Sequence, residues 1–264
     1  MQKKHYWFIF QNNLILLKKQ ADGFSIPFGV KPPVSPASAV VRKSGTFKGF
    51  ACSVFSAAED LTAPTGYKYE ELRSIYGQID AKLFQIAGKS AQIVFWDNSS
   101  IYCPVCSSKT EVFAHNAKIC PLCKKEIYPV ISAAAMVLVQ KENSLLMVRG
   151  KNFRSEHYGL VAGFLETGET LEECAAREVL EETNLKIKNI TYFASQPWPF
   201  PSGLMVGFFA DYAGGKLKIN EDELLTAEFF TKDNLPKLPG KISLARKMVD
   251  AWLKNQNQNK KKSS

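Results

Sequence analysis

The chain has 264 residues, of which 45% are hydrophobic and 22% are charged. That composition is typical of a folded protein with a buried core, and the length favours two domains. No stretch approaches the roughly 18 consecutive apolar residues of a membrane-spanning helix, and the first segment lacks a signal-peptide pattern. We therefore predict a cytoplasmic protein with no membrane partner. The formal charge of +9 favours polyphosphates or RNA as ligands.

Residues 1–100 predict a mixed α+β domain. Short apolar runs alternate with turn signals, and the runs YWFIF and LILLK around QNN predict a β-hairpin. A helical pattern follows in EELRSIYGQIDAKLFQIAG. We find no chemical motif in this part of the chain, and the role of residues 1–68 stays open.

Residues 101–128 contain two Cys-x-x-Cys pairs. The first pair is Cys103 and Cys106, and the second is Cys120 and Cys123. A proline follows the first cysteine of each pair. Four thiolates at this spacing suit a tetrahedral zinc ion, and a segment this small needs such a ligand to fold. Disulfides are the alternative, which a cytosolic location disfavours. Because four cysteines leave no open coordination position, we predict one structural Zn²⁺ in a zinc ribbon.

Residues 129–254 predict an α/β domain. Strands are expected in ISAAAMVLVQ, SLLMVRG, YGLVAGF, ITYFAS and LMVGFFADY, with one helix between them and an amphipathic helix in ISLARKMVDAWLK. This order indicates an α/β/α sandwich. Residues 255–264 have no apolar periodicity and end in lysines and serines, which predicts a disordered basic tail. We interpret the tail as a solvated end rather than a nucleic-acid arm.

Within this domain, the segment GFLETGETLEECAAREVLEETNL carries three carboxylates on one helix face. At helical spacing Glu178, Glu181 and Glu182 lie within about 100° of one another, where like charges repel. Mg²⁺ or Mn²⁺ would remove that repulsion and attract a phosphate. Arg177 is placed to pair with Glu173 or Glu181 and to hold this face in position. The alternative is an acidic helix face exposed to solvent.

The full pattern favours the metal site. Gly163, Glu169 and the run 177–182 resemble the Nudix box, the signature of hydrolases that cleave nucleoside diphosphates linked to another moiety. The family has glycine at the position of Asn184, where a residue following a helix takes the left-handed conformation. Asparagine also tolerates that conformation, so we expect the loop to be kept. At the other end of the helix, the T-x-x-E run 170–173 predicts a capping box.

The box lies between two other motifs, the cysteine ribbon before it and SQPWPFP after it. This order resembles the NudC-type NADH pyrophosphatases over roughly residues 70–253. The resemblance implies metal-dependent hydrolysis of NAD(H) to nicotinamide mononucleotide and AMP, and the removal of NAD caps from RNA 5′ ends. It also implies a homodimer, for which the apolar start of the chain and the ribbon offer surface.

The resemblance also implies the residues of the site. The ribbon cysteines would hold Zn²⁺, Arg177 would act with the helix glutamates, and Glu181 is preferred as the group that activates water. The ligands implied for two or more Mg²⁺ or Mn²⁺ ions are the Ala162 carbonyl, Glu178, Glu181, Glu182 and Glu223. Glu221 and Asp222 directly precede Glu223 and are the alternatives for that one ligand. The substrate contacts implied are Tyr128, Gln196, Pro197, Trp198, Pro199, Phe200, Pro201, Ser202, Gly203 and Ala245.

Two positions depart from the family pattern. The family motif ends in serine, but this chain has Gly203 there and Ser202 one place earlier. His115 stands where some relatives carry an acidic substrate contact. The three prolines of SQPWPFP stiffen the backbone, so Trp198 and Phe200 suit a wall for a flat base or nicotinamide ring. The alternative is that both rings only pack into a core.

Two further functions remain open. One is a Nudix hydrolase of another diphosphate, such as ADP-ribose, a diadenosine polyphosphate or a nucleotide sugar, against which SQPWPFP argues. The other is a non-catalytic sensor that binds a dinucleotide. Because Glu178, Glu181 and Glu182 are all present, turnover is favoured over sensing.

Overall fold

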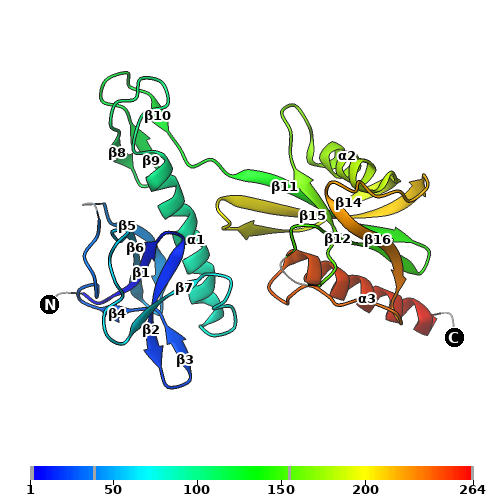
Figure 1. The fold of residues 1–264 in the computed structure, drawn as a ribbon, viewed down its shortest axis with the longest axis horizontal. Coiled ribbons are helices and arrows are strands. Elements are labelled where there is room, and N and C mark those ends of the chain that lie inside the picture. The colour runs from blue at the N-terminus through cyan, green and yellow to red at the C-terminus, as the bar shows by residue number, and fades with distance from the viewer. Residues whose placement is uncertain (1–2, 38–39, 154–155, 263–264) are drawn as a thin grey trace. The chain divides into compact units, whose positions relative to one another are not determined.

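The chain forms two compact units, each with its own sheets and hydrophobic core (Figure 1). The computed structural model describes residues 3–37, 40–153 and 156–262, with the backbone alone from residue 259. The first unit contains residues 1–131 and 198–202, and the second contains residues 132–197 and 203–264.

The first unit is built on a seven-stranded sheet packed against one helix. Its elements are β1 His5–Gln11, β2 Leu14–Gln20, β3 Gly23–Ser25, β4 Phe28–Gly29, β5 Arg42–Phe47, β6 Phe50–Ser56, β7 Tyr67–Glu71 and α1 Ala81–Ser99. The strand order is β3-β2-β1-β6-β5, with β4 also paired to β1 and β7 to β2. Strands β1 and β6 are parallel, and they form the centre of the sheet.

Strand β1 is central because both of its faces are apolar. Phe8 packs with Leu83 of α1 in one core, while Ile9 faces a second core on the other side of the sheet. A continuous apolar run of this kind suits a strand covered on both faces. The predicted hairpin is confirmed as β1–β2, and Asn12 and Asn13 form its turn with φ values of 46° and 66°.

Helix α1 begins later than the sequence pattern predicts. The apolar spacing indicates a helix from residue 70, but residues 72–78 form turns, with Gly77 at φ +78°. The Asp80 side chain accepts hydrogen bonds from two N–H groups of the first turn, at 2.8 and 3.3 Å. Because this cap satisfies backbone donors that have no partner within the helix, α1 starts at Ala81 and ends at Ser99.

The cysteine ribbon forms a separate three-stranded sheet within the first unit. Its strands are β8 Glu111–Ala114, β9 Ala117–Ile119 and β10 Glu126–Ile127. Buried cations hold it to the rest of the unit. Arg42 donates to both oxygens of Asp97, at 2.7 and 3.0 Å, and to the carbonyls of Ala114 and His115. Lys118 of β9 donates to the Asp97 carbonyl at 2.7 Å.

The second unit contains a six-stranded mixed sheet. Its elements are β11 Ser132–Lys141, β12 Ser144–Gly150, β13 Val161–Phe164, α2 Leu171–Thr183, β14 Lys186–Trp198, β15 Gly203–Gly214, β16 Leu224–Thr231 and α3 Leu244–Lys262. The strand order is β14-β15-β11-β12-β16, with β13 paired to β11. Strand β16, in the segment EDELLTAEFF, was not predicted.

Alternation along β11 explains why helices cover both faces of this sheet. Val137 and Val139 lie in the core that contains Val179 of α2, whereas Leu138 lies in the core that contains Met248 of α3. Figure 1 shows α2 and α3 on opposite sides of the strands. The predicted α/β/α sandwich is therefore confirmed.

The predicted disordered tail over 255–264 differs from the structure. Helix α3 continues through this segment to Lys262, and residues 263–264 lie outside the described residues. The segment KNQNQNKKK contains neither glycine nor proline, so nothing in it terminates a helix.

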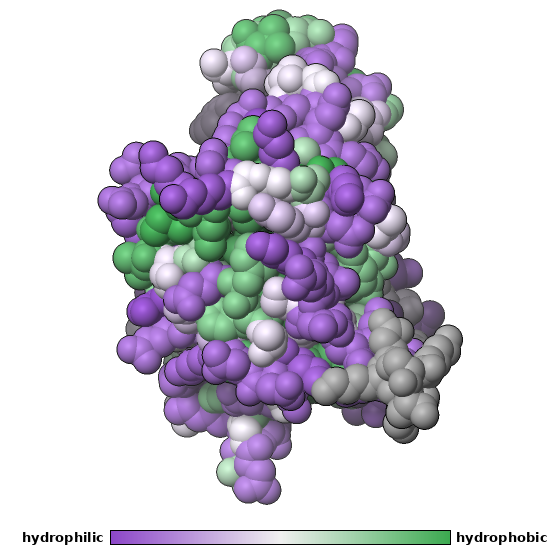
Figure 2. Space-filling model, turned by 90° about the vertical axis from the view of Figure 1, so that its right-hand side faces the viewer, coloured by the Kyte–Doolittle hydropathy of each residue, from purple (hydrophilic) through white to green (hydrophobic). Residues whose placement is uncertain are grey.

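Polar residues cover most of the face drawn in Figure 2, and hydrophobic residues form smaller groups between them. None of the helices in the described ranges is long and apolar enough to cross a membrane. The apolar start of the chain lies mainly in the sheet core, with Phe8, Ile9 and Phe10 buried. It therefore offers little of the dimer surface that the sequence suggested, whereas the ribbon exposes Val105 and Leu122.

Candidate active site and zinc ribbon

Helix α2 is fixed at both ends by the interactions that its sequence predicts. The Thr170 hydroxyl accepts from the Glu173 N–H at 3.2 Å, and the Glu173 carboxylate accepts from the Thr170 N–H at 2.7 Å, which confirms the capping box. At the other end Asn184 has φ 59° and ψ 22°, the predicted left-handed conformation. Its side chain donates to the Lys216 carbonyl at 3.0 Å. The carboxylate face of α2 thus has a defined start and end.

Two of the three helix glutamates are buried. Glu178 and Glu182 point toward strand β13, while Glu181 is exposed. The Glu178 carboxyl lies so close to Gly163 that a Cβ built on this glycine would be 1.9 Å from the Glu178 Cδ. The glycine at the start of the motif is therefore needed to leave space for a carboxylate.

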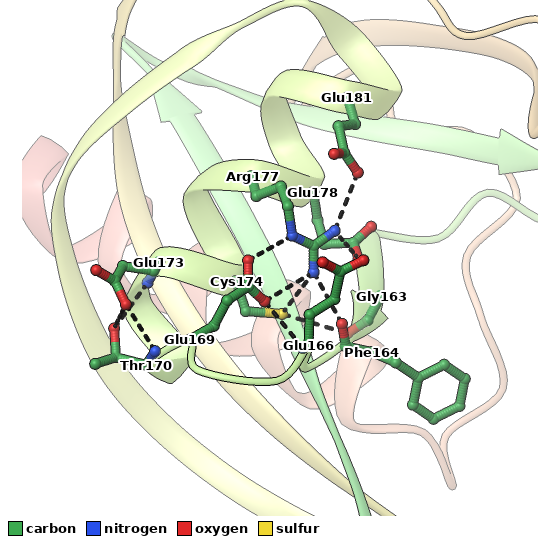
Figure 3. Close-up of polar contacts among 10 residues, drawn as sticks. All are labelled: Gly163, Phe164, Glu166, Glu169, Thr170, Glu173, Cys174, Arg177, Glu178 and Glu181. Atoms are coloured by element: carbon green, nitrogen blue, oxygen red, sulfur yellow. Dashed lines mark hydrogen bonds and ion pairs between the residues drawn. The ribbon is translucent and has the colours of Figure 1, made fainter.

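Arg177 connects the carboxylates of this site (Figure 3). Its guanidinium donates to Glu169 at 2.6 and 3.0 Å, to Glu178 at 2.8 Å and to Glu181 at 3.0 Å. It also donates to the Phe164 carbonyl at 2.9 Å. In this arrangement the arginine offsets the repulsion between the carboxylates.

Arg177 pairs with one of its two predicted alternative partners. The pair with Glu181 forms, but Glu173 is engaged in the capping box and Glu169 takes its place. Hydrogen bonding by Arg177 lowers the pKa of Glu169, and the same contact raises the pKa of Arg177. The role of Glu169 was missed, although its fixed place in the motif marked it as a candidate.

Burial changes the titration of the two inner glutamates. Desolvation raises the pKa of Glu178, although the contact with Arg177 opposes the shift. Desolvation also raises the pKa of Glu182, to about 8, and the negative charges of Glu178 and Glu223 add to this shift. No described cationic side chain forms an ion pair with Glu182, within the ranges that the structure covers. A buried carboxylate among like charges is a place where a hard cation fits.

The remaining predicted ligands lie near this pair. A hydrogen bond with the Ala162 backbone opposes the rise in the pKa of Glu182, so strand β13 contacts this carboxylate directly. The charge of Glu223 acts on both Glu178 and Glu182 and raises the pKa of each. Its carboxylate therefore lies near the two buried glutamates, and its role as a metal ligand stays a prediction.

The four ribbon cysteines come together as a ligand set. Their sulfur atoms all lie within 4.8 Å of one another, and they are the one such cluster of three or more metal-binding groups in the described ranges. Cys103 Sγ lies 3.6 Å from Cys123 Sγ, and Cys106 Sγ lies 3.4 Å from Cys120 Sγ. Tetrahedral zinc with Zn–S bonds of about 2.3 Å would separate its sulfurs by about 3.8 Å. The donor set therefore fits zinc.

Each cysteine pair is held in a similar turn. The Cys103 carbonyl accepts from the Ser107 N–H at 2.9 Å, and the Cys120 carbonyl accepts from the Lys124 N–H at 3.0 Å. Ser107 and Lys124 both have left-handed φ values, of 58° and 60°. Backbone and side-chain hydrogen bonds from Ser108 lower the pKa of Cys106 to about 6. Two equivalent turns thus present the four sulfurs to one point.

The SQPWPFP segment belongs to both units. Trp198 and Phe200 are grouped with the first unit, where their rings meet edge to face with centroids 5.1 Å apart. The Arg73 guanidinium lies over both rings, 5.1 Å from the centroid of Trp198 and 4.1 Å from that of Phe200. Phe200 also packs against the core beneath α1, and Pro199 contacts Gly88 of that helix. Arg73 was missed because the segment around it carries no motif.

The other predicted substrate contacts have varied environments. Gln196 donates to the Ile242 carbonyl at 2.9 Å and accepts from Lys247 at 3.2 Å. The Ala245 side chain is buried in the core beneath α3. Ser202 is buried and donates to the Val130 carbonyl at 2.9 Å. Tyr128, in the first unit, is exposed and donates to Glu126.

An α/β/α sandwich with this carboxylate helix is the architecture of a Nudix domain. Comparison with known families agrees, because residues 130–252 match the NUDIX domain. Residues 4–96, in which the sequence showed no motif, match the NADH pyrophosphatase-like rudimentary NUDIX domain. A solved NUDIX hydrolase from Nitrosomonas europaea has a TM-score of 0.52 and 22% identity, covers 60% of this chain and 92% of its own, and shows a shared fold.

Sequence relatives indicate which family of Nudix hydrolases the chain belongs to. The chain is 40% identical over 184 residues to the NAD-capped RNA hydrolase NudC of Klebsiella pneumoniae, a match that covers 68% of this chain and 70% of that protein. It is 33% identical over 249 residues to the NAD-capped RNA hydrolase NudC of Photorhabdus laumondii, with coverage of 94% and 93%. The chain belongs to the NudC family of Nudix hydrolases.

Proposed function

We propose that this chain is a metal-dependent hydrolase that cleaves the pyrophosphate bond of NAD(H) to nicotinamide mononucleotide and AMP. We include the removal of NAD caps from RNA 5′ ends, because the same bond joins such a cap to RNA. The observation that carries the proposal is the buried Glu178 carboxyl, which fits against Gly163 and is held by Arg177. The names of the relatives from Klebsiella pneumoniae and Photorhabdus laumondii support the substrate.

The residues that would hold catalytic Mg²⁺ or Mn²⁺ are Ala162 through its carbonyl, Glu178, Glu181, Glu182 and Glu223. Two or more such ions would neutralise negative charge on the pyrophosphate and on the leaving phosphate. The buried and mutually repelling Glu178 and Glu182 fit this role, because ionising both without a cation is unfavourable. The ribbon cysteines would hold one structural Zn²⁺.

The protein groups divide into positioning and reacting roles. Arg177 is a positioning residue, because it contacts Glu169, Glu178 and Glu181 through one guanidinium. Glu181 has the most accessible carboxylate of the three, with a side-chain exposure of 55%, which supports its assignment as the group that orients or deprotonates water. Glu178 and Glu182, which are buried, then suit direct metal ligation, and Glu181 would combine its metal contact with the role toward water.

Trp198 is the preferred candidate for the ring that selects NAD. Phe200 packs against the core of the first unit, whereas Trp198 belongs to none of the described core clusters. A half-buried ring fixed by prolines loses little freedom when it stacks on a base or nicotinamide. We expect Trp198→Ala to reduce kcat/KM for NADH more than for ADP-ribose. An equal loss on both substrates would indicate a structural role for the ring.

The test of the function is turnover of NADH, NAD, ADP-ribose and NAD-capped RNA by the purified chain with Mg²⁺ or Mn²⁺. We expect Glu178→Gln to lower kcat on the order of a hundredfold or more. Glu172→Gln, an exposed glutamate of the same helix, is the matched control and should leave kcat unchanged. Cleavage of ADP-ribose in preference to NADH would favour the other hydrolase, and no turnover with any divalent metal would favour the sensor.

The domain limits, the dimer and the location are also proposals. We propose an N-terminal domain over 1–100, a ribbon over 101–128 and a catalytic domain over 129–254.

Exposed hydrophobic side chains on the ribbon, including Val105 at 69% and Leu122 at 71%, support a homodimer contact. Light scattering during size-exclusion chromatography tests the dimer, and cell fractionation tests the cytoplasmic location.

A further inference from the structure

An aromatic cluster lies toward one end of the central strands of the first unit, away from any motif in the sequence. Tyr6 of β1 contacts Phe28 of β4 with ring centroids 4.5 Å apart, and Phe28 contacts Phe50 of β6 at 4.9 Å. Phe47 of β5 completes the cluster, 5.4 Å from Tyr6. The four rings come from four strands that Figure 1 shows close together, and pairing joins β4 to β1, β1 to β6 and β5 to β6.

The outer two rings are exposed although the inner two belong to the core. Phe28 is 42% exposed and Phe50 is 41% exposed, while Phe47 is buried and Tyr6 packs partly into the core under α1. A side-chain contact holds β4 in place, because Trp7 donates its indole N–H to the Gly29 carbonyl at 3.0 Å. The exposed rings therefore stand on a rigid base, which reduces the entropy lost on binding.

Two lysines lie beside the cluster. Lys4 Nζ lies 5.8 Å from the centroid of Phe28, and Lys48 Nζ lies 5.2 Å from that of Phe47. Lys48 and Gly49 form the β5–β6 turn with φ values of 48° and 79°, so the lysine projects at the end of a tight hairpin. Residues 1–58 contain seven lysines and one arginine but a single acidic residue, Asp22. Much of the net charge of the chain thus lies in this segment.

We propose that this surface, formed by Lys4, Tyr6, Phe28, Lys48 and Phe50 and called here the aromatic–lysine face, binds single-stranded RNA. Exposed rings give bases a stacking platform, and lysines beside them contact phosphates, which is the combination that sequence-independent single-strand binding uses. A strongly basic segment favours a polyanion over a neutral protein surface. The inference rests on the proposed function, since it assigns a place for the RNA that follows an NAD cap.

Binding and turnover are measured separately so that the two proposals fail separately. The binding test is fluorescence anisotropy of the full-length protein with a short, labelled, uncapped single-stranded RNA over a range of salt concentrations. The variants are Phe28→Ala/Phe50→Ala and Lys4→Ala/Lys48→Ala. The matched controls are Tyr192→Ala and Lys188→Ala, an exposed aromatic residue and an exposed lysine of the second unit. Turnover of free NADH by each variant reports the proposed function independently of RNA.

We expect the ring variant to weaken RNA binding by roughly tenfold or more, with the controls unchanged. The lysine variant, which changes no core residue, should lower the slope of log K against log salt by about 0.7 for each phosphate that is no longer neutralised. Turnover of NADH should stay at the wild-type level in both. Unchanged RNA affinity in both variants, or an equal reduction in the controls, overturns the proposal. If Phe28→Ala/Phe50→Ala binds RNA as the wild type does but no longer self-associates, the RNA proposal is overturned and the face is a contact between two copies of the chain.

Discussion

Gly163 lies directly against the carboxyl group of Glu178, and a Cβ at this glycine would be 1.9 to 2.1 Å from the carboxyl atoms. No side chain fits there unless Glu178 moves. We therefore expect Gly163→Ala to reduce kcat on the order of a hundredfold, because a displacement of about 1 Å at a reacting group has an effect of that size. Gly240→Ala is the control, since its nearest atom would be an ordinary contact at 3.9 Å. Wild-type kcat in Gly163→Ala would contradict the role given to Glu178.

The guanidinium of Arg177 determines the second prediction. Arg177→Lys should keep a positive charge but lose the fork that contacts Glu169, Glu178 and Glu181, so kcat should fall at least about tenfold. In Arg177→Met, which also loses the positive charge, kcat should fall further. Because the carboxylates then repel one another, added Mg²⁺ should raise the melting temperature of Arg177→Met more than that of the wild type. Equal Mg²⁺ shifts in thermal unfolding would indicate that Arg177 does not offset this repulsion.

Glu182 gives a prediction for the effect of pH on stability without added Mg²⁺ or Mn²⁺. Burial raises the pKa of its carboxyl from 4.5 to about 8 in the folded chain. Below about pH 4.5 the Glu182 carboxyl is protonated in both the folded and the unfolded chain, and its favourable contribution to the free energy of unfolding is complete. As pH rises toward about 8, the unfolded chain releases this proton first, so the free energy of unfolding falls by up to about 1.4 kcal/mol per pH unit.

Urea unfolding of the full-length chain at several pH values measures how the free energy of unfolding depends on pH. Glu182→Gln should flatten this dependence, because an amide does not titrate, whereas Glu172→Gln, at an exposed position of the same helix, should keep the wild-type dependence. Added Mg²⁺ should weaken the dependence, since a bound cation favours the ionised carboxyl. A Glu182→Gln curve that follows the wild type would show that another group is responsible.

The ribbon should contain one zinc per chain, measured by elemental analysis. Cys106→Ser should lose that metal, whereas Cys174→Ala should retain it, because Cys174 of α2 is buried in the core of the second unit and lies outside the cluster. Zinc removal should speed hydrogen exchange in residues 101–128, since a segment this small depends on its metal to fold. The backbone amides of β11 and β15, in the second unit, should stay protected from hydrogen exchange. Retention of zinc by Cys106→Ser would contradict the ligand set.

Asn184 can be tested with a pair of substitutions. Both Asn184→Gly and Asn184→Ala remove the hydrogen bond to the Lys216 carbonyl, but alanine alone is strained at φ 59°. Asn184→Ala should therefore be less stable than Asn184→Gly by about 1–2 kcal/mol in equilibrium unfolding. Equal stability would mean that the left-handed conformation at this position relaxes.

Several parts of the fold could be predicted because their signals are local. The hairpin at Asn12 and Asn13, the capping box of α2 and the left-handed Asn184 each depend on residues within a few positions of one another. The start of α1 was predicted wrongly because apolar spacing continued past the true boundary, where the Asp80 cap decides. Strand β16 was missed because its pairing partner, β12, is far away in the sequence.

By itself, the sequence determined the catalytic motif, the zinc-ligand spacing and the two-motif order typical of the family, since each is a spacing of reactive groups along the chain. Tertiary structure decided which of those groups are buried and what they contact. It selected Glu169 as a partner of Arg177, placed Phe200 against a core, and brought Tyr6, Phe28 and Phe50 together from separate strands. These contacts join residues distant in the chain, and their energy depends on desolvation that exists only when the sheets and helices have packed.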